Sequence, residues 1–168
     1  MRSGGDRRVG REPAAVAGYR PVAVVVDDDP SWREWMQFHL SRNGWETLCA
    51  ESAAAALPLV AEHEPDVVVL DENMPGDSGS KLASTLRQRG YAGRMMLLSA
   101  STDASLYRRC SSLSVQCVSK LAQGSLFAIL AAWKAELSAA HPPVVIDLTG
   151  DPAEADAGRL RRFLRISR

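Results

Sequence analysis

Residues 66–76 read DVVVLDENMPG, and this stretch decides the fold. Four branched apolar residues lead directly into the carboxylate of Asp71, and Pro75-Gly76 then turns the chain. A short run that is apolar at every position, and not only at alternate ones, indicates a strand covered on both faces of a sheet. Asp71 is therefore expected at the point where this strand leaves the core.

Four other short segments are also expected to be strands, of which 45–50 is the weaker, and each of the five is followed by a segment with the apolar spacing of a helix. We expect strands at 21–27, 45–50, 66–70, 94–99 and 115–119, and helices at 31–42, 52–63, 79–89, 103–112 and 123–140. This alternation predicts an α/β fold with a parallel sheet, right-handed crossovers and helices on both faces. Ligands in such sheets bind at the carboxyl ends of the strands.

Local signals predict how two of these helices begin or bend. Ser31 is followed three residues later by Glu34, the pattern of a capping box, so we expect Ser31 to be the N-cap of the first helix. Pro58 lies inside the second helix and must kink it or shift its start, because proline cannot donate a backbone hydrogen bond. Trp32 and Trp35, near the first acidic strand end, are expected to pack rather than to bind a cofactor.

The composition is typical of a globular protein: of 168 residues, 46% are apolar and 24% are charged. No apolar run is long enough to span a bilayer, and no apolar segment follows the basic N-terminus as a secretory signal would require. Cys49, Cys110 and Cys117 form no closely spaced pair. We therefore expect reduced thiols that act as small core residues, in a cytoplasmic protein without a membrane partner.

The net charge is zero, but the charge is unevenly distributed. Residues 1–20 carry +3, residues 21–150 carry −5 and residues 151–168 carry +2. The basic residues at the two ends are few and belong to no binding motif, so we expect no direct binding to nucleic acid. Residues 1–20 lack an apolar period and are expected to form a flexible basic arm.

Polar groups follow four of the five expected strands: Asp27-Asp28-Asp29, Asp71, Ser99 and Lys120. Because the carboxyl ends of parallel strands meet at one edge of a sheet, we expect these groups to converge. Clustered carboxylates repel one another unless a cation neutralises them, and Mg²⁺ accepts one or two direct carboxylates together with water. A carboxylate in such a site can attack phosphorus to form an aspartyl phosphate, while a lysine supplies positive charge to a phosphoryl oxygen.

Four segments resemble the receiver domain of two-component response regulators in their order and spacing. They are VVVDDDPSWRE (24–34), DVVVLDENMPGDSG (66–79), LLSAS (97–101) and VSK (118–120). The resemblance covers residues 21–138 and places a receiver domain at 21–140. It implies a flavodoxin-like (βα)₅ fold with strand order 2-1-3-4-5.

The resemblance also implies a role for each polar residue at the sheet edge. Asp71 would accept a phosphoryl group from a sensor histidine kinase or a phosphotransfer protein, Ser99 would sense that group and Lys120 would pair with it. Asp27 and Asp28 would form the acidic pair, with Asp28 favoured as the direct Mg²⁺ ligand, and Asn73 would offer its backbone carbonyl. The implied metal ligands are therefore Asp27, Asp28, Asp71 and Asn73.

Two positions depart from the usual pattern of this family. Leu121 stands where a proline usually follows the lysine, and Cys117 stands where an aromatic residue usually lies. A cysteine cannot perform the ring reorientation that usually couples the phosphorylation site to the output face.

Residues 141–168 form a C-terminal extension, in which we expect a strand at 144–148 and a helix at 152–166. About thirty residues are too few for an effector domain. The pattern therefore favours a single-domain response regulator, a phosphoacceptor module rather than an enzyme. Its phosphorylation would switch contacts with a downstream protein or with a second copy in a homodimer.

Two alternative functions belong to other classes. A receiver-like interaction module would act without phosphate, through its terminal segments. A phosphatase of the haloacid-dehalogenase type would use Asp27-x-Asp29, but it needs a further acidic pair after the lysine, and Glu136 and Asp147 do not form one. The phosphatase also leaves Asp71 unexplained.

Overall fold

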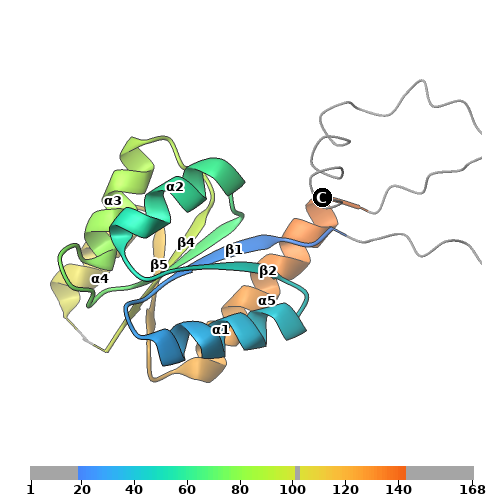
Figure 1. Cartoon of the computed structure of the whole chain (residues 1–168), viewed down its shortest axis with the longest axis horizontal. Helices are drawn as coiled ribbons and strands as arrows, with labels where there is room; N and C mark the ends of the chain where they lie inside the picture. The colour runs from blue at the N-terminus through green and yellow to red at the C-terminus, as the bar shows by residue number, and fades with distance from the viewer. Residues whose placement is uncertain (1–18, 101–102, 143–168) are drawn as a thin grey trace, which may run out of the picture. The chain divides into compact units, whose positions relative to one another are not determined.

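The computed structural model describes residues 19–100 and 103–142. These residues form a five-stranded parallel sheet with the order β2-β1-β3-β4-β5 (Figure 1). The strands are β1 (Val22–Val26), β2 (Glu46–Ala50), β3 (Val67–Asp71), β4 (Arg94–Ser99) and β5 (Val115–Ser119). The helices are α1 (Pro30–Arg42), α2 (Ala53–His63), α3 (Gly79–Gln88), α4 (Ala104–Ser112) and α5 (Gln123–Ala140). The predicted flavodoxin-like fold and its strand order are confirmed.

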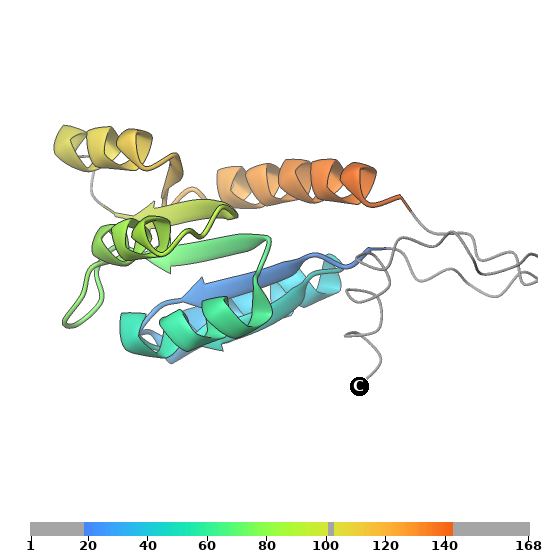
Figure 2. The same ribbon diagram turned by 90° about the horizontal axis from the view of Figure 1, so that it is seen from above.

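Helices cover both faces of the sheet (Figures 1 and 2). Helices α2, α3 and α4 pack on one face, while α1 and α5 pack on the other. Strand β3 lies in the middle of the sheet, and all five of its residues are buried. The core therefore follows the continuous apolar runs, because a strand covered on both faces has no side that can be polar.

The pairing register decides which residues reach the edge of the sheet. Val26 at the end of β1 pairs with Leu70, so Asp27 follows β1 at the same level at which Asp71 ends β3. Ser99 and Ser119 pair at the ends of β4 and β5. Figure 2 shows the strand arrows pointing the same way, which places these ends at one edge.

The first helix begins one residue earlier than predicted, and Ser31 is not its N-cap. Asp29 is the N-cap, and its carboxylate accepts a hydrogen bond from the Ser31 N–H at 2.9 Å. Pro30 occupies the first helical position, where the missing N–H costs no hydrogen bond. The predicted capping box of Ser31 and Glu34 is wrong because the Asp-Pro pair before it starts the helix more favourably.

The second helix begins at Ala53, one residue later than predicted, and runs through Pro58 to His63. Ser52 caps it by accepting a hydrogen bond from the Ala55 N–H at 3.2 Å. A proline leaves the carbonyl four residues earlier without its helical donor. Here that carbonyl belongs to Ala54, which is an exposed residue, so water can replace the donor.

Several predictions about the chain ends lie outside the described residues. These are the arm at 1–20, except for its last two residues, and the extension at 141–168, except for its first two. The three cysteines are free thiols, with Cys110 buried and the other two half-buried. Across the described ranges, no helix combines the length and the hydropathy that a membrane span requires.

Helix α3 begins directly against the end of β3. Gly79, its first residue, donates its N–H to the carbonyl of Glu72 at 3.2 Å. A Cβ atom at this position would overlap the carbonyl oxygen of Asp71 and would lie 2.7 Å from a methyl group of Leu97. Only glycine permits this close approach, which fixes the backbone beside Asp71.

We expect Gly79→Ala to lower the free energy of unfolding by about 2 kcal/mol, because the added methyl group overpacks the end of β3. The measurement is urea unfolding followed by circular dichroism. Gly124→Ala is the matched control, since Gly124 also lies in the first turn of a helix but a Cβ atom there would point into open space. The control should be neutral or stabilising by up to about 1 kcal/mol. Equal losses in both variants would contradict the proposed steric role.

Candidate functional site

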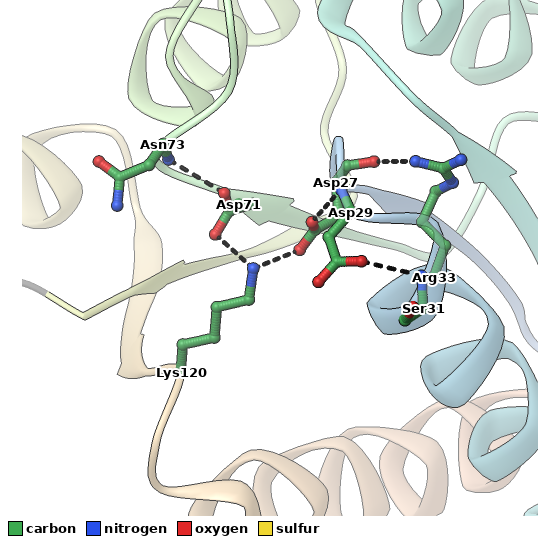
Figure 3. Close-up of polar contacts among 7 residues, drawn as sticks. All are labelled: Asp27, Asp29, Ser31, Arg33, Asp71, Asn73 and Lys120. Atoms are coloured by element: carbon green, nitrogen blue, oxygen red, sulfur yellow. Dashed lines mark hydrogen bonds and ion pairs between the residues drawn. The ribbon is translucent and has the colours of Figure 1, made fainter.

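One lysine bridges two buried carboxylates at the edge of the sheet (Figure 3). The Lys120 Nζ donates to Asp27 Oδ2 at 2.7 Å and to Asp71 Oδ1 at 3.1 Å. Asp27 is 1% exposed and Asp71 is 4% exposed. The two aspartates come from the neighbouring strands β1 and β3, whereas the lysine follows β5 and reaches across the end of β4.

Burial and the contacts between Lys120 and the aspartates shift the pKa values of these groups in opposite directions. Burial raises the pKa of Asp27, and the charge of Asp71 adds to this effect, while hydrogen bonds from Lys120 and the Asp29 N–H reduce it. Burial lowers the pKa of Lys120, but its hydrogen bonds and charge interactions with the two aspartates outweigh burial, so this pKa is raised. The ammonium therefore remains charged.

A third carboxylate belongs to the same cluster. In the described part of the chain, single carboxylate oxygens of Asp27, Asp28 and Asp71 all lie within 4.8 Å of one another. Asp28 is exposed, in contrast to the other two. One ammonium cannot balance three carboxylates, and clustered oxygen ligands are what a hard divalent cation such as Mg²⁺ prefers. The donor set therefore fits Mg²⁺.

The other two predicted site residues lie at the same edge. The backbone N–H of Asn73 donates to Asp71 Oδ2 at 3.1 Å, so the loop after β3 bends back over the carboxylate. Ser99 is buried at the end of β4. Its backbone carbonyl accepts a hydrogen bond from the backbone N–H of Lys120 at 2.9 Å. The structure thus brings together all six predicted residues: Asp27, Asp28, Asp71, Asn73, Ser99 and Lys120.

Asp29 and Arg33 support the cluster, although neither is among the predicted site residues. The Asp29 N–H donates to Asp27 Oδ1 at 3.0 Å, while its carboxylate caps α1. Arg33 Nη1 donates to the carbonyl of Asp27 at 2.7 Å (Figure 3). The position of Arg33 in the first turn of α1 is the sequence signal that could have identified it. Because the Asp29 carboxylate caps α1, Asp27 and Asp29 do not form the joint site that the phosphatase alternative would use.

A second polar network connects the loop after Asp71 to two helices. The Glu72 carboxylate accepts hydrogen bonds from the N–H and the hydroxyl of Ser80 on α3, at 2.8 and 3.0 Å. Arg109 on α4 donates to the same hydroxyl at 3.0 Å. No local sequence pattern indicates this network, because its members meet only when α3 and α4 pack side by side.

The family comparison agrees with this geometry. Residues 23–127 match the family model of the response regulator receiver domain. The chain is also similar to the response regulator MprA from Mycobacterium sp. (strain KMS), with 32% identity over 158 residues, covering 88% of this chain and 68% of MprA.

A second curated relative is much longer than the matched region. The transcriptional regulatory protein KdpE from Mycobacterium tuberculosis is 36% identical over 85 residues. This match covers 50% of the chain and 37% of KdpE, so the chain spans little more than a third of that protein.

A solved structure has the same fold. The crystal structure of the response regulator protein TrrA from Thermotoga maritima, in complex with Mg(2+)-BeF, superposes with a TM-score of 0.60. It is 26% identical and covers 67% of this chain and 98% of TrrA. Other solved structures of receiver domains are less identical in sequence to this chain and share its fold.

We expect Mg²⁺ to raise the thermal unfolding midpoint, because a ligand that binds only the folded state stabilises it. At a free Mg²⁺ concentration a hundredfold above Kd, the free energy of unfolding increases by about 2.7 kcal/mol. Asp28→Asn should remove most of this shift in differential scanning calorimetry. The control is Asp77→Asn, which removes another exposed carboxylate, paired with Lys81, and should retain the shift. Identical shifts in the two variants would argue against a metal site at the cluster.

Proposed function

This chain belongs to the response regulator receiver domain family, and from this premise we propose that it is a phosphorylation-controlled switch. Asp71 accepts the phosphoryl group from a sensor histidine kinase or a phosphotransfer protein. One observation carries the proposal: the buried Asp71 carboxylate is held by Lys120 beside two further carboxylates at the strand ends. Receiver domains are signalling modules, and we assign the chain this role rather than that of an enzyme with turnover.

The proposed transfer forms one bond and breaks one. An oxygen of the Asp71 carboxylate attacks phosphorus, and the bond from phosphorus to the leaving group breaks. That bond is P–N when the donor is a phosphohistidine, and the departing imidazole keeps the electron pair and takes up a proton. Bound Mg²⁺ would offset negative charge on the phosphoryl oxygens. Its proposed ligands are Asp27, Asp28, Asp71 and the carbonyl of Asn73.

The other polar residues then act on the acyl phosphate. Lys120 already contacts Asp71 Oδ1, so its ammonium is within reach of a phosphoryl oxygen attached to that side chain. Ser99 ends the neighbouring strand, and we assign its hydroxyl a hydrogen bond to a second phosphoryl oxygen. Phosphorylation adds negative charge and acceptor oxygens at the edge of the sheet, which forces these groups to change partners.

We expect wild-type protein incubated with Mg²⁺ and acetyl phosphate to gain an acid-labile phosphoryl group, detected by intact-protein mass spectrometry. Asp71→Asn should not be modified, because the amide is not a nucleophile toward phosphorus. Asp77→Asn should be modified like the wild type, since that exposed carboxylate lies outside the cluster. Failure of the wild type to be modified, or equal modification of Asp71→Asn, would refute the proposal.

The output of the switch is proposed to be a change in protein contacts, with a downstream partner or a second copy, in the cytoplasm. Similarity to KdpE does not extend the proposal to transcription, because the match covers only 37% of that protein. The two family departures, Cys117 and Leu121, lie on the β5 side of the site, where Cys117 is half-buried and Leu121 is 84% exposed.

We expect a pull-down with immobilised protein to capture its partner in a manner that depends on acetyl phosphate, and Asp71→Asn to lose this dependence. The reason is that the charge change at Asp71 is what alters the contact surface. If Asp71→Asn binds the partner unchanged while deletion of residues 142–168 abolishes binding, the chain is instead a module that works without phosphate.

A further inference from the structure

Trp32 lies directly beside the lysine of the site. It comes from the first turn of α1, is half-buried, and places its ring 5.0 Å from the Lys120 Nζ. This distance is within the range of a cation–π interaction, in which the negative face of the indole attracts an ammonium. Trp32 therefore contacts the site through its ring and not through a polar atom.

The ring complements the two carboxylates around the ammonium. The Lys120 Nζ has three protons and donates to Asp27 and Asp71. Its side chain is 24% exposed, and the next residue, Leu121, is 84% exposed and provides little cover. The Trp32 ring thus supplies an uncharged contact that limits how far the ammonium can swing away from the carboxylates.

An aromatic cluster, defined as Trp32, Trp35, His39 and Phe127, fixes this ring. The Trp32 and Trp35 rings lie 4.8 Å apart, and Trp35 packs against His39 at 4.6 Å and against Phe127 of α5 at 5.4 Å. Such pairs restrict ring motion because their centroids lie at favourable aromatic distances. Aromatic residues of α1 and α5 therefore hold the Trp32 ring in its place beside Lys120.

The indole N–H of Trp32 differs from its ring in its contacts. Within the described residues, its Nε1 is buried and has no hydrogen-bond acceptor. A buried donor without an acceptor is costly, so such a group in a folded protein requires a physical explanation. The contacts described for Trp32 are therefore those of its ring, with Lys120 and Trp35.

We propose that Trp32 is a positioning residue for Lys120. Its ring holds the ammonium within reach of Asp27 and Asp71, and so keeps it ready for the phosphoryl group. The structural part of this proposal concerns the resting site alone. The consequence for phosphoryl transfer rests on the proposed function.

The position of Lys120 can be tested by NMR without phosphorylation. The chain has only three lysines, Lys81, Lys120 and Lys134, so ¹³C-lysine labelling gives a simple spectrum, and Lys120→Met identifies the signal. We expect the Lys120 Hε protons to be shifted upfield by the indole ring current. Trp32→Leu should abolish this shift, and Trp32→Phe should keep much of it. Lys81 and Lys134 serve as internal references.

The same variants test the functional consequence with acetyl phosphate and Mg²⁺. Trp32→Leu should slow phosphorylation about five- to tenfold, the size expected from loss of one partly desolvated cation–π contact. Trp32→Phe should stay within about twofold of the wild type, because it retains an aromatic face. Combined with Lys120→Met, Trp32→Leu should have no further effect, because Trp32 acts through the lysine.

Trp133→Leu is the matched control. Trp133 is also half-buried with a cation over its ring, Arg94 at 5.5 Å, but it lies away from the site. This variant should leave the Lys120 signal and the phosphorylation rate unchanged. An unchanged Lys120 shift in folded Trp32→Leu would overturn the positioning role. A wild type that shows the ring-current shift but gains no phosphoryl group would support that role and refute the proposed function.

Discussion

The structure depends on the burial of two carboxylates, Asp27 and Asp71, at one edge of a parallel sheet. Each buried charge costs several kcal/mol unless partners replace the lost water. Lys120 provides the counter-charge, and the backbone N–H groups of Asp29 and Asn73 each donate one hydrogen bond. Asp28 adds a third carboxylate to this cluster, whereas Lys120 contributes a single ammonium. This imbalance favours a cation at the cluster, which is the basis of the proposed Mg²⁺ site.

The surrounding elements are arranged so that this edge keeps its shape. Gly79 lets α3 begin against the carbonyl of Asp71, which holds the end of β3. Asp29 starts α1 at the end of β1, and this start places Arg33 over the carbonyl of Asp27 and Trp32 over Lys120. The start of a helix is a local feature, yet the starts of α1 and α3 help to set the positions of Asp27, Asp71 and Lys120, which come from the ends of three different strands.

The sequence predicts the fold well because β1, β3 and β4 are largely apolar runs and all five strands alternate with helical segments. It predicts the site because the site residues lie at the ends of the strands. The N-cap at Ser31 is wrong because two neighbouring signals compete, and the stronger Asp29-Pro30 pair wins. Contacts between distant helices cannot be predicted in this way. Ser80 and Arg109 are 29 residues apart, and their hydrogen bond depends on how α3 and α4 pack. The contact of Trp32 with Lys120 likewise depends on side-chain directions.

Lys120 connects the stability of the resting site to the proposed chemistry. Asp27 holds the ammonium at 2.7 Å, which is closer than the 3.1 Å to Asp71, so a phosphoryl group on Asp71 must compete with Asp27 for the same donor. A cation bound to Asp27 would neutralise that carboxylate and weaken its hold on the lysine. Metal binding and transfer of Lys120 to the phosphoryl oxygens would then favour each other. The Trp32 ring is uncharged and does not compete with either oxygen, so it can hold the lysine near the site in both states.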